Sequence, residues 1–224
     1  MLIGAIADIH GNFDAMRRAM TRHAEVPWWV CVGDVASSTG AYPEPPAPLY
    51  WIKGNNEEFD RIADWDAGRA APPNLFYIKN GTAVRVGPLL VGGVGGTYAP
   101  KWYDTPTAQL PHTPKDDKRR HFVREEIEAC KRLHGVDILM THEAPRPFIV
   151  SAEGDSRPAK RWDAGKRPIN ELLAAVRPRL HLCGHHHRFA ETDREGVRSV
   201  CIDRINRSYL LIDASTLTYQ KIEQ

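Results

Sequence analysis

The chain has 224 residues, of which 42% are hydrophobic and 26% are charged, a composition that is ordinary for a folded protein and argues against extended disorder. Its 30 lysines and arginines against 28 aspartates and glutamates give a formal net charge of +2, too small to indicate a nucleic-acid partner by electrostatics alone. This length predicts a single domain over residues 1–224 with a substantial core.

The amino-terminal segment has neither a basic region nor a long apolar stretch before Asp8. No later run approaches the roughly 18 uninterrupted apolar residues of a membrane helix. We therefore expect a protein without a membrane segment, located in the cytoplasm. No Cys-x-x-Cys pair occurs, so we expect reduced core thiols at Cys31, Cys130, Cys183 and Cys201.

The first apolar run, from Leu2 to Ala7, is too short for a typical helix and is followed at once by the polar residues Asp8 and His10. It predicts a buried strand that delivers polar side chains at its end. Residues 12–25 then carry apolar side chains near helical spacing, which predicts a helix. The chain thus begins with a strand-to-helix unit.

The same pattern recurs along the chain, and each apolar run stops where a polar cluster begins. Further strands are predicted at 27–32, 49–52, 89–94, 136–140 and 180–183. Helices are predicted from about Asp117 to Leu133 and, shorter, after Pro168. Short runs at 198–202, 209–212 and 217–222 predict a terminal antiparallel meander. The glycine- and proline-rich stretch 92–114 predicts a surface loop, long enough to wall a substrate site.

Open α/β sheets place their functional sites beyond the carboxyl ends of strands, so the polar residues after five of these strands are expected to converge. The polar residues after any one strand are more often an ordinary turn or a buried polar group. Their occurrence after five successive strands is what indicates a metal site. Carboxylate, imidazole and amide donors suit manganese, iron or zinc, and the absence of thiolates disfavours structural zinc. Alternation along an extended segment directs His185 and His187 to one side and His186 away.

In chain order, the ligand-type motifs are Asp8-x-His10, Gly33-Asp34, Gly54-Asn55, His142 and Gly184-His185-x-His187. Their order and spacing resemble the signature of calcineurin-like metallophosphoesterases. The resemblance implies an α/β fold, namely the metallophosphatase four-layer α-β-β-α sandwich with two mixed β-sheets flanked by helices. It also implies two divalent metal ions, with manganese expected and iron or zinc as alternatives. In the family's scheme, Asp34 bridges the ions, and the remaining ligands are Asp8, His10 and His187 for one ion and Asn55, His142 and His185 for the other.

The same resemblance implies a metal-dependent phosphoric ester hydrolase, in which a hydroxide bridging the metals attacks phosphorus. The substrate would be a phosphate ester, including a nucleotide or nucleic acid. No Gly-x-Ser-x-Gly or Walker-type loop is present, so no serine nucleophile is expected. The expected catalytic residues are Asp34, Asn55, Asn56 and His142.

Asn56 departs from the family's pattern, in which Gly-Asn-His precedes an acidic residue. An amide can donate a hydrogen bond to a phosphate oxygen but cannot deliver a proton at neutral pH. Three explanations stay open: the substrate has a good leaving group, His112 substitutes as the acid, or solvent supplies the proton. We expect Asn56, His112 and Arg146 to bind substrate.

Four central segments resemble RNA lariat-debranching enzymes, which are phosphodiesterases; the segments are 74–78, 92–98, 141–146 and 171–178. The segment after Asp34 lacks the Asp-Arg-Gly continuation of the Ser/Thr protein phosphatases. We therefore expect a phosphodiesterase, with a nucleotide pyrophosphatase or phosphomonoesterase as the alternative. A protein-interaction scaffold, like the retromer subunit of this fold, is the non-enzymatic alternative, and the complete set of seven ligand positions disfavours it. The native metal, the natural substrate and the oligomeric state stay open.

Overall fold

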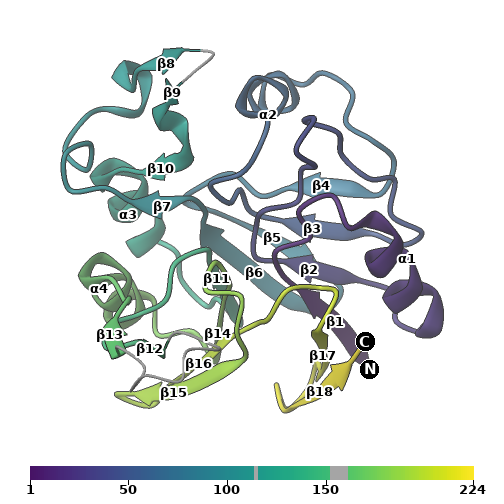
Figure 1. The fold of residues 1–224 in the computed structure, drawn as a ribbon. Helices are drawn as coiled ribbons and strands as arrows, with labels where there is room; N and C mark the ends of the chain where they lie inside the picture. Colours follow the sequence, from purple (N-terminus) through teal and green to yellow (C-terminus); the bar gives the residue numbers. More distant parts are fainter. Residues whose placement is uncertain (114–115, 152–160) are drawn as a thin grey trace.

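The computed structural model describes residues 1–113, 116–151 and 161–224. Two six-stranded mixed sheets pack face to face, and helices cover the outer face of each (Figure 1). This arrangement confirms the α-β-β-α sandwich expected from the sequence.

The first sheet consists of β1 (Leu2–Ile6), β2 (Trp29–Cys31), β3 (Leu49–Trp51), β4 (Leu75–Tyr77), β17 (Ser208–Asp213) and β18 (Tyr219–Glu223). Their order across the sheet is β18–β17–β1–β2–β3–β4. β1 to β4 are parallel, whereas β17 pairs antiparallel with both β1 and β18. The carboxyl ends of β1, β2 and β3 therefore lie along one edge.

The second sheet consists of β5 (Thr82–Val86), β6 (Leu89–Val94), β11 (Ile138–Thr141), β14 (Leu180–Cys183), β15 (Ala190–Arg194) and β16 (Val197–Cys201). Their order is β15–β16–β14–β11–β6–β5. The four central strands are parallel, and β5 and β15 pair antiparallel at the two edges. Here too, the carboxyl ends of β11 and β14 point the same way.

The helices α1 (Phe13–Arg22) and α2 (Phe59–Asp66) cover the first sheet, while α3 (Arg124–Lys131) and α4 (Arg167–Val176) cover the second. Side chains alternate along each strand, so β1 directs Ile3 and Ala5 into the core between the sheets and Ile6 toward α1. Apolar runs that are buried on both faces are typical of parallel sheets under helices. This explains why the strand segments are continuous apolar runs.

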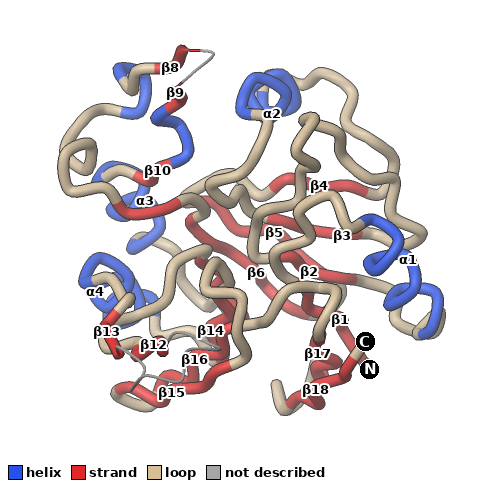
Figure 2. The backbone as a smooth tube through the Cα atoms, viewed as in Figure 1, coloured by secondary structure: helices blue, strands red, loops and turns tan. Residues whose placement is uncertain are grey.

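Residues 99–113 and 116–122 project beside α2, and we call them the arm (Figure 1). Much of the arm is loop (Figure 2). The described residues also form three two-stranded ribbons: β7 (Thr97–Tyr98) with β10 (His121–Phe122), β8 (His112–Thr113) with β9 (Asp116–Asp117), and β12 (Ile149–Ser151) with β13 (Arg161–Asp163). The arm also holds the 3-10 turns η1 (Thr107–Gln109) and η2 (Lys118–Arg120).

The helix expected from about Asp117 to Leu133 is shorter in the structure and begins only at Arg124. Val123 has an extended backbone, and its N–H donates to the Glu126 carboxylate at 3.0 Å, which caps the helix start. The preceding residues pair as β9 and β10 or form η2. Three consecutive cations at 118–120 are also unfavourable at a helix amino terminus.

The expected terminal antiparallel meander is confirmed for β17 and β18, which pair antiparallel, but it is wrong for the preceding strand, because the last strands divide between the two sheets. β16 pairs with β14 in the second sheet, whereas β17 and β18 join the first. The connection passes the site edge, where the Ile205 N–H donates to the Ala7 carbonyl at 3.1 Å. β4, β5, β15 and α2 were not predicted as elements.

Among the described residues, no helix is both long enough and apolar enough to cross a membrane. All four cysteines are buried with free thiols.

Gly4 on β1 lies against the indole ring of Trp29, where a Cβ would approach ring atoms to 2.2 Å. We expect Gly4→Ala to lower the free energy of unfolding by about 1 to 3 kcal/mol because the ring must shift within a close-packed core. Urea denaturation followed by fluorescence measures this loss. Trp29→Leu should make the added methyl group less costly, so additive effects of the two substitutions would contradict this steric account.

Candidate metal centre

The candidate residues lie on loops that follow the carboxyl ends of β1, β2, β3, β11 and β14. Backbone hydrogen bonds hold these loops together: Asp8 N–H donates to the Gly33 carbonyl at 3.1 Å, and His10 N–H donates to the Asp34 carbonyl at 2.8 Å. Between the two loops of the second sheet, Gly184 N–H donates to the His142 carbonyl at 3.2 Å. The positions of the side chains therefore follow from paired main chains.

Five of the candidates have a left-handed backbone, with φ between 47° and 67°: Asp8, His10, Asp34, His185 and His187. This region is uncommon for residues other than glycine, although aspartate and histidine tolerate it better than most. Residues in rare conformations cluster at functional sites. These five residues lie on the loops after β1, β2 and β14, where the candidate side chains come together.

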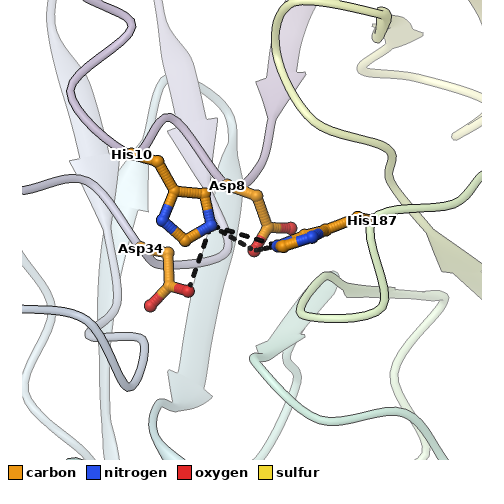
Figure 3. Close-up of side chains that lie close together, drawn as sticks. All are labelled: Asp8, His10, Asp34 and His187. Atoms are coloured by element: carbon orange, nitrogen blue, oxygen red, sulfur yellow. Dashed lines mark hydrogen bonds and ion pairs between the residues drawn. The ribbon is translucent and has the colours of Figure 1, made fainter.

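The first group of side chains is Asp8, His10, Asp34 and His187, whose nearest ligand-type atoms all lie within 4.8 Å of one another (Figure 3). The two Nε2 atoms of His10 and His187 are 3.1 Å apart. An oxygen of Asp34 lies 3.4 Å from the first of these nitrogens, and an oxygen of Asp8 lies 3.4 Å from the second. Nitrogen and oxygen atoms thus converge on a common point.

The second group is Asp34, His142 and His185, again within 4.8 Å. The Nδ1 atom of His142 lies 2.8 Å from the Val32 carbonyl and must donate to it, because a carbonyl only accepts. Its Nε2 faces Asn55 Oδ1 at 3.1 Å and Asp34 Oδ1 at 3.6 Å. Asp34 belongs to both groups and lies between them.

The donor set fits a pair of divalent cations. Burial, and secondarily the neighbouring His142, lower the pKa of His185 to about 3, and burial also lowers the pKa of His10, so both imidazoles are neutral and can ligate. Burial acts to raise the pKa of Asp34, but His142 and the hydrogen bonds from Asn56 outweigh it and hold the pKa below its ordinary value. Burial acts to lower the pKa of His142, but Asp34 and Asp8 outweigh it and raise that pKa to about 10, so His142 must release a proton when a metal ion binds.

Asn56 lies directly against Asp34. Its backbone N–H and its side-chain Nδ2 each donate to a different oxygen of the Asp34 carboxylate, both at 2.8 Å. The carboxylate is therefore fixed in orientation by this asparagine. Asn56 also lines the cleft next to the site, so it contacts both Asp34 and the space that a ligand would occupy.

Glu57 is a site residue to which the sequence analysis gave no role. Its carboxylate is buried and accepts hydrogen bonds from the N–H groups of Val35, Ala36 and Gly54 at 3.0 to 3.2 Å and from the Tyr42 hydroxyl at 2.9 Å. Burial, reinforced by Asp34, raises the pKa of Glu57 to about 7. Glu57 joins the loop after β2 to the loop after β3; the acidic residue after Asn55-Asn56 was its only sequence signal.

A cleft of about 710 Å³ opens beside the first group and runs between α2, the loop at 36–40 and the arm. His10, Asn55, Asn56 and His112 are among its lining residues. The stretch expected to wall a substrate site thus does line the cleft, through His112 and Thr113, whereas Pro114 lies outside the described residues. This volume is within the range of small-molecule sites, about 300 to 1,000 Å³.

Arg146, the third expected substrate-binding residue, is not among the lining residues of this cleft. Its guanidinium group donates to the Asp163 carboxylate at 2.6 Å, and its N–H donates to Asn170 at 2.7 Å. Both contacts direct it to the surface formed by β13 and α4. The structure does not bring Arg146 together with the other candidates.

His186 lies outside both groups of ligand-type side chains. Its ring stacks on Phe148 with 4.7 Å between centroids, and its Nε2 is 4.0 Å from a carboxylate oxygen of Glu143. His186 therefore points away from the two groups, as expected, but the segment is not extended as that expectation assumed, because His185 and His187 have a left-handed backbone.

We expect Glu57→Ala to lower the free energy of unfolding by about 3 kcal/mol, because it leaves buried N–H donors of two site loops without their acceptor. It should also weaken metal binding, since the loops that carry Asp34 and Asn55 lose their common anchor. Chemical denaturation and metal titration measure the two effects. Glu58→Ala is the matched control, because Glu58 is half-buried and its carboxylate accepts no hydrogen bond from the described residues; an equal loss in both variants would contradict this role.

Comparison with known proteins identifies relatives of this chain. Curated relatives include the lariat debranching enzymes of Schizosaccharomyces pombe, 25% identical over 80% of this chain, and of Drosophila pseudoobscura pseudoobscura, 26% identical over 63% of it. The chain spans only 42% and 29% of the length of these two proteins.

Solved structures share the fold across nearly the full chain at low identity. The protein TT1561 of Thermus thermophilus has a TM-score of 0.66 and 14% identity, with 99% of this chain and 98% of that chain covered. A protein described as a novel archaeal phosphodiesterase has a TM-score of 0.51 and 13% identity, with both chains covered completely. At these identities the likeness establishes the fold alone. The calcineurin-like phosphoesterase superfamily domain matches residues 1–202, and the chain therefore belongs to this superfamily of metal-dependent phosphoester hydrolases.

Proposed function

We propose that residues 1–224 act as one calcineurin-like domain that hydrolyses a phosphodiester with two divalent metal ions, manganese first among the candidates. Asp8, His10 and His187 are assigned to one ion, Asn55, His142 and His185 to the other, and Asp34 to both. The observation that carries this proposal is the position of Asp34 in both groups of converging ligand-type atoms.

Two ions held in this way would lower the pKa of a coordinated water toward neutrality and offset the charge that develops on the phosphoryl oxygens. The chain's own contribution is to hold the ligands in place before substrate binds. Asn56 fixes the Asp34 carboxylate, and the carbonyl of Val32 fixes the tautomer of His142, leaving its Nε2 to face the site.

Several observations favour a diester or a pyrophosphate over an alkyl monoester. Asn56 has no proton to deliver to a leaving group, so substrates with a stabilised leaving group are better suited. His112 lines the same cleft and is the other candidate for a proton donor on the substrate side. The likeness to lariat debranching enzymes supports a diester, and the lack of an acid at Asn56 keeps nucleotide pyrophosphates as the second candidate.

Asp34→Ala should abolish hydrolysis of an aryl phosphodiester, with a loss above about a hundredfold, because it removes the ligand common to both ions. Calorimetric titration with Mn²⁺ should show that binding at both positions is weakened. Asp14→Ala, on the exposed face of α1, serves as the control and should leave both properties unchanged. Unchanged turnover in the Asp34 variant is incompatible with the mechanism. If the metal-loaded parent hydrolyses no phosphomonoester, phosphodiester or pyrophosphate, the scaffold alternative is favoured instead.

Asn56→His should raise the rate of hydrolysis of alkyl phosphodiesters relative to that of aryl ones, because an imidazole can protonate a poor leaving group. Such proton transfer contributes about a hundredfold or more to the rate. The ratio of kcat/KM for the two substrates is the measurement, since it cancels losses common to both. Asn56→Gln keeps an amide and is the control. A ratio that does not change in the histidine variant would show that protonation at this position does not limit the reaction.

A further inference from the structure

The wall of the cleft formed by the arm carries both signs of charge, but most of these charges are paired. The Arg119 guanidinium group reaches across the cleft to Asp60 on α2 at 2.6 Å and also contacts the Asp117 carboxylate. Lys118 pairs with Asp116 at 2.6 Å. The carboxylates of the arm therefore already have cationic partners.

Arg120 differs from its neighbours. It lines the cleft, and within the described part of the chain its one hydrogen bond runs from Nε to the Asp117 carbonyl at 2.8 Å. The two terminal nitrogens of its guanidinium group meet no carboxylate there. A half-buried guanidinium whose terminal nitrogens have no partner among the described residues presents the planar fork that binds phosphate oxygens in pairs.

Glu58 is a cleft carboxylate that remains without a cation among the described residues. Its Oε2 atom lies against Gly40, on the opposite wall formed by the loop at 36–40. Negative charge at that wall disfavours an anion there and leaves the Arg120 wall as the place for one. His112 lines the cleft as well, and its ring adds a hydrogen-bonding nitrogen.

The arm is fixed relative to the candidate metal centre by Lys53, a buried lysine directly before Gly54-Asn55. Its Nζ donates to the Arg119 carbonyl at 2.9 Å and lies 3.7 Å from the Glu126 carboxylate. Its own carbonyl accepts from Gly96 N–H at 2.8 Å. Lys53 thus connects Arg119, the residue before Arg120, to the loop that carries Asn55 and Asn56.

We propose that Arg120 binds a second phosphate of the substrate, while the first phosphate lies at the candidate metal centre. A cleft of about 710 Å³ that begins at His10 and ends at the arm has room for a nucleotide beyond the reacting group. The substrate class is then an ester with at least two phosphates, and a nucleotide is the form that the cleft has room for. This inference rests on the proposed function, because the first phosphate is placed by the metal-binding residues.

The test uses three probes that need no turnover: thymidine 5′-phosphate, thymidine 3′,5′-bisphosphate and thymidine 5′-diphosphate. Each is titrated into the Mn²⁺-loaded protein by calorimetry. We expect a second phosphate to tighten binding about tenfold or more, the scale of a charge-assisted contact. A gain with the bisphosphate indicates a phosphate across a nucleoside, as in an oligonucleotide; a gain with the diphosphate indicates a pyrophosphate.

Arg120→Gln should remove this gain and leave the affinity for the monophosphate unchanged, and Arg120→Lys should restore part of it. Lys118→Gln is the matched control, since it removes one positive charge from the same arm at a residue already paired. The proposal is overturned if Arg120→Gln keeps the parent's preference, if the parent shows none, or if both charge removals weaken binding equally.

Failure of the proposed function has a separate signature, because a parent that binds these nucleotides yet hydrolyses no phosphate ester would contradict catalysis alone. The difference between the bisphosphate and the monophosphate would still decide the role of Arg120.

Discussion

The structure depends on one buried carboxylate. Asp34 is 1% exposed and lies where the loops of the two sheets meet, with His10 on one side and His142 on the other. A buried charge is costly unless hydrogen bonds and opposite charge surround it. Asn56 supplies hydrogen bonds to both oxygens, and the converging imidazoles supply nitrogens that can share a cation with it. The packing of the two sheets against each other therefore brings the ligands together, and the ligands favour that same packing.

The sequence predicted those features that are encoded locally. A strand such as β1 is a continuous apolar run, and the polar pair Asp8 and His10 directly follows it, so strand, loop and candidate ligands could all be read from one short segment. The convergence of several such segments followed from a general property of parallel sheets. Neither step required knowledge of contacts between distant residues.

Features that rest on distant contacts were missed. The role of Glu57 depends on donors from Val35 and Ala36, more than twenty residues earlier, and no local pattern reveals them. The start of α3 was misplaced because the pairing of β10 with β7 competes with the helical tendency of residues 117–123. Arg146 follows a candidate ligand closely in sequence, yet its pairing with Asp163 directs it elsewhere. Closeness along the chain was a poor guide to closeness in space at these points.

The left-handed residues at the strand ends have a consequence for ion binding. A turn of this kind persists only where neighbouring contacts determine it, and here the main-chain hydrogen bonds from Asp8 to Gly33 and from His10 to Asp34 are such contacts. The conformational freedom of these loops is already lost when the chain folds. An arriving cation then meets ligands that need little rearrangement, so ordering of the main chain subtracts little from its affinity.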